Sequence, residues 1–220
     1  MNLHATKNNL HAFRHWFGAS RALTMVKGTS LHECMVSPRV MYHTSREGGF
    51  SRFEIGRPTI NSTTFSDVQT RRHALFVTPS VDDSNAYGKQ DGAFVTGATT
   101  IPVYVRSERP LDLTEGVSEE DERWLVAAGF SERFIHNYLH RWDVLDDDEG
   151  KLVVNMLRMA GYDAVIFNDE NPITGRSFEA WALFSPDQVV MAIDYPQART
   201  LVIPPAKTHR ARQFESALSM

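Results

Sequence analysis

The sequence contains very little cysteine, because Cys34 is the only one among its 220 residues. A single thiol cannot form an internal disulfide, and it excludes a zinc site built from several cysteines. We therefore expect a fold without internal cross-links, which is the usual condition in a reducing compartment.

The sequence also lacks a long hydrophobic run and a strong charge of either sign. No apolar stretch approaches the ~20 residues that span a bilayer, and residues 1–12 lack the hydrophobic core of a secretory signal. The formal net charge is −4, which gives no general attraction to nucleic acid or to an anionic membrane. We predict no membrane partner and a place in the cytoplasm, reached directly or by delivery through other machinery.

The composition is that of a globular domain. Hydrophobic residues make up 42% of the chain, and 13 Phe and 4 Trp supply enough bulk for a substantial core. We predict an N-terminal appendage over residues 1–37 with a short amphipathic helix, a main domain over residues 38–195, and an irregular C-terminal tail over residues 196–220. The side chains of Phe13, Trp16 and Phe17 form the apolar stripe of that helix, and Gly18 is placed to end it.

The order of predicted elements excludes a regular alternation of strands and helices. Strands are predicted at 40–45, 74–78, 101–106, 164–167, 178–184 and 189–193. Helices lie between the third and fourth strands, with Ser118 and Ser131 as N-caps and Gly161 as the residue that ends the last helix. This order favours an α+β fold with antiparallel sheets.

Two further local features carry expectations. Asp82 or Asp83 is expected to cap a helical turn that presents Ser84 and Tyr87 on one face. The polar, glycine-rich residues 46–72 are expected to form a long loop that acts as a lid.

Two polar residues stand out in apolar strands. His43 ends the first predicted strand, where it is either a solvated histidine or a group delivered to the edge of a cleft. Glu179 lies inside an apolar strand and shares a face with Trp181 and Leu183, so it belongs to a wet rim or to a cleft. No histidine has the spacing to acidic residues that a metal site requires, and we predict no metal. The acidic run at 146–149 is either a cation ligand or a solvated start to the following helix.

Eight short motifs occur in a fixed order between residues 13 and 190. They are Phe13-x-x-Trp16-Phe17-Gly18-x-Ser20, Tyr42-His43-Thr44-Ser45, Phe76-Val77-Thr78, Ser84-x-x-Tyr87, Pro102-Val103-Tyr104-Val105, Pro110-Leu111-Asp112, Gly161-Tyr162-Asp163-Ala164-Val165-Ile166 and the stretch from Glu179 to Gln188. Together they resemble the ADP-ribosyltransferases found in phage polyvalent proteins. That group is similar in fold to the poly(ADP-ribose) polymerase and diphtheria-toxin branch of the superfamily.

The resemblance implies a fold and a set of site residues. The fold is an ADP-ribosyltransferase-like split antiparallel β-sandwich with inserted helices around an NAD cleft. The implied catalytic residues are Glu179, His43 and Tyr87, with Glu179 one residue before the position that some relatives use, Ala180. The implied NAD-binding residues are His43, Thr44, Ser45, Phe76, Thr78, Ser84 and Tyr87, with Thr44 at a position where the family usually has glycine.

The resemblance also implies a reaction. It predicts an NAD-dependent mono-ADP-ribosyltransferase, encoded by a phage or prophage, that transfers ADP-ribose to a host macromolecule through an oxocarbenium-like transition state. NAD serves as co-substrate and a host protein is the expected acceptor. A nucleic-acid acceptor is the alternative, which the charge does not indicate. The host cytoplasm is the expected location, with packaging in the virion as a route of delivery. The alternative is a catalytically inactive protein of the same fold with a structural or binding role, for example in the virion.

Overall fold

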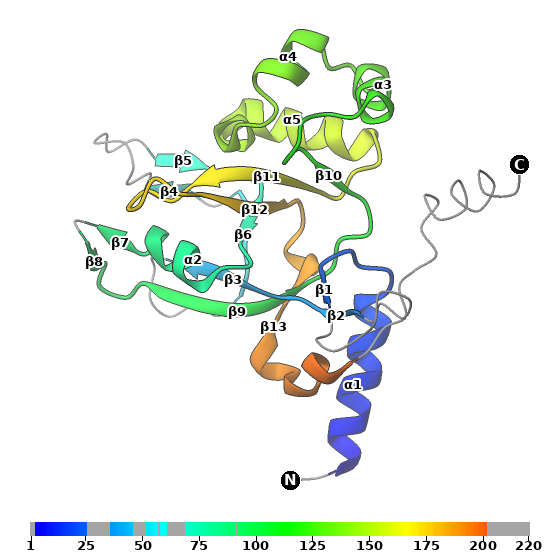
Figure 1. Ribbon diagram of the computed structural model, residues 1–220, viewed down its shortest axis with the longest axis vertical. Helices are drawn as coiled ribbons and strands as arrows, with labels where there is room; N and C mark the ends of the chain where they lie inside the picture. Colours follow the sequence, from blue (N-terminus) through cyan, green and yellow to red (C-terminus); the bar gives the residue numbers. More distant parts are fainter. Residues whose placement is uncertain are drawn as a thin grey trace, which may run out of the picture.

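Two stacked β-sheets form the centre of the protein (Figure 1). The computed structural model describes residues 3–25, 36–45, 52–56, 58–60, 69–90 and 92–201. The 4-stranded sheet has the order β10-β11-β12-β6, and the 3-stranded sheet has the order β13-β9-β3. The strands are β3 (Val40–Ser45), β6 (Leu75–Val77), β9 (Thr99–Val105), β10 (Pro110–Asp112), β11 (Ala164–Glu170), β12 (Ser177–Leu183) and β13 (Val189–Met191).

The helices and the short ladders lie around these sheets. The α-helices are α1 (Leu3–Phe17), α2 (Val81–Tyr87), α3 (Glu119–Ala127), α4 (Glu132–Asn137) and α5 (Asp147–Met159), and the 3-10 turns are η1 (Trp142–Leu145), η2 (Pro186–Gln188), η3 (Ala192–Asp194) and η4 (Pro196–Thr200). The 2-stranded ladders are β1 (Leu23–Met25) with β2 (Val36–Pro38), β4 (Pro58–Ile60) with β5 (Gln69–Arg71), and β7 (Lys89–Gln90) with β8 (Ala93–Phe94).

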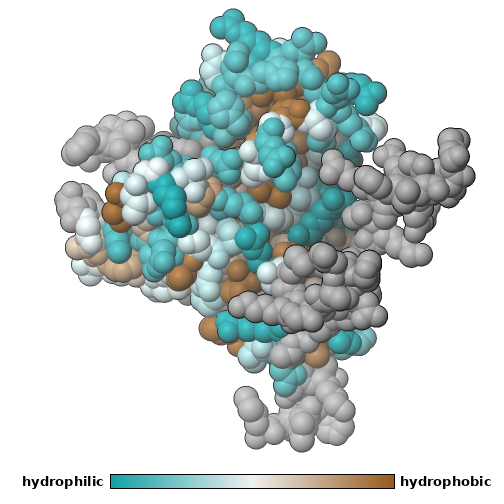
Figure 2. Space-filling view, in the orientation of Figure 1, coloured by the Kyte–Doolittle hydropathy of each residue, from teal (hydrophilic) through white to brown (hydrophobic). Residues whose placement is uncertain are grey.

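The alternation of side chains along β12 assigns one core to each of its faces. Ala180 and Ala182 pack with the helical layer of α3, α4 and α5, whereas Trp181 and Leu183 pack in the core between the two sheets. Strand geometry requires this division, since successive side chains point to opposite faces. Figure 2 shows that the helical layer presents mainly hydrophilic residues to the solvent on the visible face. The alternation of apolar side chains on both faces therefore places β12 between two cores.

The predicted α+β class with antiparallel sheets is confirmed, with one parallel strand pair. Residues Pro110–Asp112 of β10 run parallel to Ala164–Ile166 of β11. Parallel neighbours need a long crossover connection, and the segment with α3, α4 and α5 supplies it. The ladders between β11 and β12, β12 and β6, β3 and β9, and β9 and β13 are antiparallel.

Local signals for helix ends were mostly correct. The hydroxyls of Ser118 and Ser131 accept the expected backbone hydrogen bonds, and Gly161 has the positive φ of +87° expected after α5. The expected cap at Asp82 or Asp83 is wrong, because the hydroxyl of Ser80 accepts from the backbone N–H of Asp83 instead. The serine directly precedes the helix and leaves the carboxylate of Asp83 for other contacts.

The N-terminal helix α1 is longer than expected and packs tightly. Phe13 and Phe17 are each 1% exposed and belong to a third core with Tyr104, Ala198 and Leu201. The ring of Phe13 meets that of Tyr104 edge-on with centroids 5.0 Å apart. This core covers the face of the 3-stranded sheet that points away from the 4-stranded sheet.

Two further predictions from the sequence concern a lid and the membrane. The predicted lid over residues 46–72 falls largely on residues 46–51, 57 and 61–68, which lie outside the described residues. No helix in the described part of the chain has the length and apolar character needed to cross a membrane.

Candidate functional site

A pair of backbone hydrogen bonds joins the two sheets beside His43. The N–H of Tyr42 donates to the carbonyl of Thr78 at 2.8 Å, and the N–H of Thr78 donates back at 3.0 Å. This bridge brings the ring of His43 to the carbonyl oxygen of Phe76, 2.8 Å from Nδ1. Because a carbonyl can only accept, Nδ1 carries the proton and Nε2 is left as the acceptor nitrogen.

The surroundings keep His43 neutral near pH 7. Burial lowers the pKa of His43, and the positive charge of Arg72 lowers it further, while the hydrogen bond to Phe76 acts in the opposite direction. The ring of Phe53 also contacts the imidazole edge-on, with centroids 5.7 Å apart. The structure therefore supplies the neutral histidine that a hydrogen bond to a sugar hydroxyl needs.

Tyr87 reaches the 4-stranded sheet from the end of α2. Its hydroxyl donates to Oδ2 of Asp169, and its ring meets Phe178 edge-on with centroids 6.1 Å apart. Burial raises the pKa of Tyr87, and the negative charge and hydrogen bond of Asp169 raise it further. The phenol is therefore held protonated and in a fixed orientation.

Arg72 links the histidine and the tyrosine. Its guanidinium carbon lies 5.2 Å from the centre of the Phe76 ring. Its charge acts on His43 and also counteracts part of the rise in the pKa of Tyr87. Arg72 thus lies over the ring of Phe76, whose carbonyl holds His43, and its Nε lies 3.6 Å from Oδ1 of Asp146.

A network of hydroxyl groups ties α2 to the 3-stranded sheet. Oγ1 of Thr44 lies 2.8 Å from the hydroxyl of Ser84 and 2.7 Å from that of Thr100. Thr100 donates in turn to Oδ1 of Asn85 at 2.6 Å. The side chains of Thr44 and Ser84, both predicted to bind NAD, are therefore adjacent and contact one another.

The other two predicted hydroxyl residues are Thr78, which directly follows β6, and Ser45, the last residue of β3. Thr78 is buried beside the sheet-joining bridge, and its hydroxyl accepts from the backbone N–H of Ser80 at 3.3 Å. Ser45 ends β3, half-buried and opposite Thr99. The predicted residues His43, Thr44 and Ser45 of β3 and the predicted residues Phe76 and Thr78 therefore lie on two segments that the bridge between Tyr42 and Thr78 joins.

An ion pair between the buried Asp83 and the exposed Arg176 fixes α2 against the turn between β11 and β12. Asp83, 1% exposed, accepts from Arg176 at 2.8 Å and from the amide of Asn171 at 2.8 Å. Burial alone would raise the pKa of Asp83, but hydrogen bonds from Ser80, Asn171 and Arg176 hold that pKa below its ordinary value. This anchor sets the position from which Tyr87 reaches Asp169.

Glu179 lies apart from this group. Its Oε1 accepts from Arg39 at 2.7 Å and from the indole N–H of Trp181 at 2.8 Å. Glu179 shares the inter-sheet face of β12 with Trp181, whereas Tyr87 contacts Phe178 on the opposite face. The structure therefore does not bring Glu179 to Tyr87.

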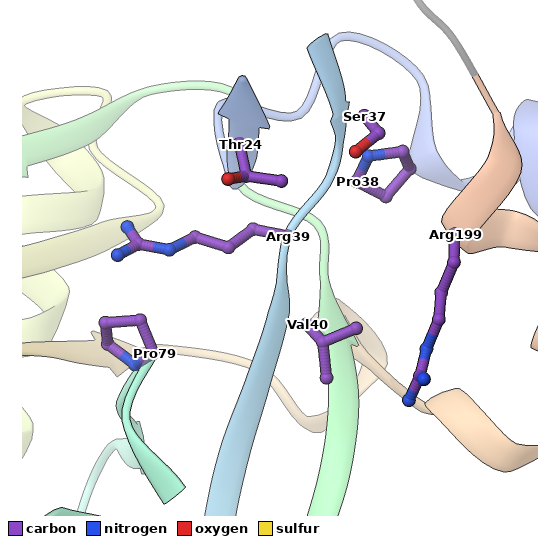
Figure 3. A pocket seen from close by; sticks show the side chains of 7 residues that line it. All are labelled: Thr24, Ser37, Pro38, Arg39, Val40, Pro79 and Arg199. Atoms are coloured by element: carbon purple, nitrogen blue, oxygen red, sulfur yellow. The ribbon is translucent and has the colours of Figure 1, made fainter. Parts of the chain in front are cut away.

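One arginine pairs with Glu179, and a second lines the neighbouring cavity. A cavity of about 380 Å³ beside it is lined by residues that include Arg39, Pro79 and Arg199. In Figure 3 the side chain of Arg39 extends to one side of the strand, and the side chain of Arg199 lies on the other side. The two guanidinium groups do not converge on a common ligand, and Arg39 already pairs with Glu179.

Sequence reasoning missed Arg39, Arg72 and Asp169. Asp169 could have been found, since Val165, Phe167 and Asp169 alternate on one face of a strand. The strand was expected to end at Phe167, because the polar residues after it read as a turn. Among the described residues, no group of three or more His, Cys, Asp or Glu side chains could hold a metal ion.

Comparison with known proteins gives one match. A family model described as ADP-ribosyltransferase in polyvalent proteins matches residues 37–196. No curated protein and no solved structure matches the chain.

Proposed function

The chain belongs to the ADP-ribosyltransferases in polyvalent proteins, and on that premise we propose that it is an NAD-dependent mono-ADP-ribosyltransferase. One observation carries the proposal: His43 hydrogen-bonds the carbonyl of Phe76, and the ring of Phe76 lies 5.2 Å from the guanidinium carbon of Arg72, all within the matched segment. A neutral histidine, aromatic rings and a cation suit the ribose, the flat nicotinamide and the pyrophosphate of NAD, respectively.

The proposed NAD site is centred where the two sheets join. His43 hydrogen-bonds a ribose hydroxyl, and the aromatic ring of Tyr87 or Phe76 stacks on nicotinamide. The remaining proposed contacts come from the backbone and hydroxyl groups of Thr44, Ser45, Thr78 and Ser84. The adjacency of Thr44 and Ser84 supports their common role.

The reaction breaks the bond between the ribose C1′ and the nicotinamide nitrogen. The bonding electron pair leaves with nicotinamide, which departs neutral, and positive charge appears on C1′ and the ring oxygen of the ribose. A lone pair of the acceptor then forms the new bond to C1′, and the acceptor gives up a proton. A carboxylate near the ribose stabilises the transient cation, and the family resemblance implies Glu179 for that role.

The proposed acceptor is a protein of a host cell. The family name places such domains in polyvalent proteins, which supports phage or prophage origin and action in the host cytoplasm, with delivery from the virion as a route. The formal net charge of −4 does not favour a nucleic-acid acceptor.

Release of nicotinamide from NAD is the direct test of activity. The full chain is incubated with NAD, alone and with a bacterial lysate, and nicotinamide is measured by chromatography. We expect release that increases with lysate, together with labelled ADP-ribose on lysate proteins. NAD that stays intact under both conditions would support the inactive structural or binding protein instead.

Binding of NAD is tested separately by thermal stability. NAD should raise the melting temperature of the wild type by mass action, and His43→Ala should reduce this shift. His136→Ala, a substitution of an exposed histidine on α4, is the matched control and should keep the full shift. An equal shift in all three proteins would remove His43 from the NAD site.

A further inference from the structure

We propose that Asp169 is the carboxylate that contacts the nicotinamide ribose in this chain. The proposal rests on the proposed function and assigns the residue that stabilises the positive charge. Asp169 lies near the end of β11 and is half-buried. It is absent from the motifs through which the chain resembles its family.

The sheet register places Asp169 on the face of Tyr87. Asp169 pairs with Phe178 across the antiparallel ladder, and Phe167 pairs with Ala180. Phe167, Phe178 and Ala180 all belong to the core on the helical side of the sheet, so the alternation puts Asp169 on that side as well. The hydrogen bond from the hydroxyl of Tyr87 to Oδ2 of Asp169 spans this face.

A cavity opens beside Asp169. Its volume is about 440 Å³, and its lining includes Asn168, Asp169, Glu170 and Ser177. This volume lies in the range typical of small-molecule sites. Asp169 thus contacts Tyr87 and also lines an open cavity, so a ribose bound in that cavity would reach its carboxylate.

Asp169 retains the capacity to accept a substrate hydroxyl. Its Oδ2 accepts from Tyr87, and its Oδ1 accepts from the backbone N–H of Glu170 at 2.8 Å. An ionised carboxylate offers about four acceptor positions, so these two contacts leave room for the ribose 2′-hydroxyl. They also fix the orientation of the carboxylate before the substrate arrives.

Glu179 is less suited to the same role. Its Oε1 receives both Arg39 and Trp181, and the positive charge of Arg39 already neutralises it. The body of the strand separates it from Tyr87, because Glu179 and Phe178 point to opposite faces. A ribose held next to Tyr87 therefore meets Asp169 first.

The role of Asp169 in the reaction is electrostatic. As the bond from C1′ to the nicotinamide nitrogen breaks, its electron pair leaves with nicotinamide and the ribose becomes cationic. Asp169 accepts a hydrogen bond from the 2′-hydroxyl, and its negative charge stabilises this cation without forming a covalent bond. The acceptor supplies the electron pair for the new bond to C1′ and loses its proton to solvent.

The experiment compares nicotinamide release by the wild type, Asp169→Asn, Glu179→Gln and Tyr87→Phe. Asp169→Asn can still accept from Tyr87 but lacks the charge, so kcat should fall by about 100-fold or more. KM and the NAD-induced shift in melting temperature should stay close to wild type. Glu132→Gln, which removes an exposed carboxylate at the start of α4, is the control and should keep the wild-type rate.

The other two variants separate the competing roles. Tyr87→Phe removes the hydroxyl but leaves the charge of Asp169, and its loss in kcat should be less than a tenth of that of Asp169→Asn. Equal losses would reduce Asp169 to a positioning residue for Tyr87 and overturn the proposal. Glu179→Gln should lose less than tenfold, and a larger loss there than in Asp169→Asn would return the role to Glu179.

Failure of the proposal and failure of the function give different results. A wild type that cleaves NAD no faster than Asp169→Asn, while both are active, overturns the assignment of Asp169 alone. A wild type that leaves NAD intact with and without lysate overturns the proposed function, and the role of Asp169 falls with it.

Discussion

His43 is a half-buried imidazole, a group whose ordinary pKa lies close to neutral pH. In the folded protein burial lowers its pKa below the ordinary value of 6.5, with Arg72 acting in the same direction. The unfolded chain therefore binds a proton at a higher pH than the folded one. This contribution to stability is complete above about pH 6.5 and is lost as the pH falls towards the lower, folded-state value.

A single substitution isolates this contribution. His43→Gln keeps an N–H for the carbonyl of Phe76 and cannot titrate. We expect the melting temperature of the wild type to fall more steeply between pH 7.5 and pH 5 than that of His43→Gln. Calorimetry of both proteins over this range measures the two slopes, and parallel slopes would mean that His43 titrates alike in the folded and unfolded states.

Among the elements, α5 depends on one glycine, Gly150, for its close packing against η1. Gly150 is buried in the first half of α5. A Cβ added to Gly150 would lie only 2.1 Å from the carbonyl carbon of Leu145, which is an overlap with backbone. Backbone atoms cannot move aside as a flexible side chain can. The close contact between α5 and η1 therefore requires a residue without a side chain at this position.

Gly150→Ala should accordingly destabilise the fold although alanine favours helix. We expect a loss of about 1–3 kcal/mol or more in the free energy of unfolding, the usual range for overpacking. Urea denaturation measures it, with Lys151→Ala as the control because Lys151 is the exposed next residue. A variant at position 150 as stable as the wild type would show that α5 and η1 separate without cost.

The elements also show how far sequence reasoning reached. The caps at Ser118 and Ser131 could be predicted because each signal lies within four residues of the helix that it starts. Strand β10 was missed, since its three residues carry no periodicity and its partner β11 lies beyond three helices. The end of β11 was set too early, because pairing with β12 keeps Asn168, Asp169 and Glu170 in a strand despite their polar character.

The motifs named residues for a candidate site but could not give the arrangement of those residues. The motifs pointed to His43, Phe76 and Tyr87, and the structure shows His43 bonded to the carbonyl of Phe76 and Tyr87 bonded to Asp169. Which face of β12 Tyr87 approaches depends on long-range contacts of α2, above all Asp83 with Arg176. Such a contact leaves no periodic signal, so sequence alone could not show that Glu179 and Tyr87 lie on opposite faces.

In the molecule as a whole, α1 packs against the face of the 3-stranded sheet that points away from the 4-stranded sheet. The predicted appendage over residues 1–37 contributes Phe13 and Phe17 to a core shared with Tyr104 of β9 and Ala198 of η4. The indole N–H of Trp16 also donates to the carbonyl of Asp187 at 3.0 Å. Burial on this scale indicates that α1 stabilises the sandwich.

Phe13→Ala tests whether α1 is needed for the stability of the whole chain. Removing a buried phenylalanine ring typically costs about 3–5 kcal/mol, and we expect a single unfolding transition shifted by that amount. His15→Ala, on the exposed side of α1, should have little effect. A Phe13→Ala protein with wild-type stability would show that residues 1–37 are an independent appendage, as the sequence predicts.

The antiparallel ladder between β11 and β12 makes positions 167, 169, 178 and 180 close neighbours on one face of the sheet. An acidic side chain at position 169, 178 or 180 therefore points to the face of the sheet that Tyr87 contacts. Mutation can therefore remove a carboxylate from one strand and restore it on the next while the backbone stays unchanged. A substitution that removes a carboxylate from one of these positions therefore leaves the neighbouring strand able to supply negative charge to the same face of the sheet.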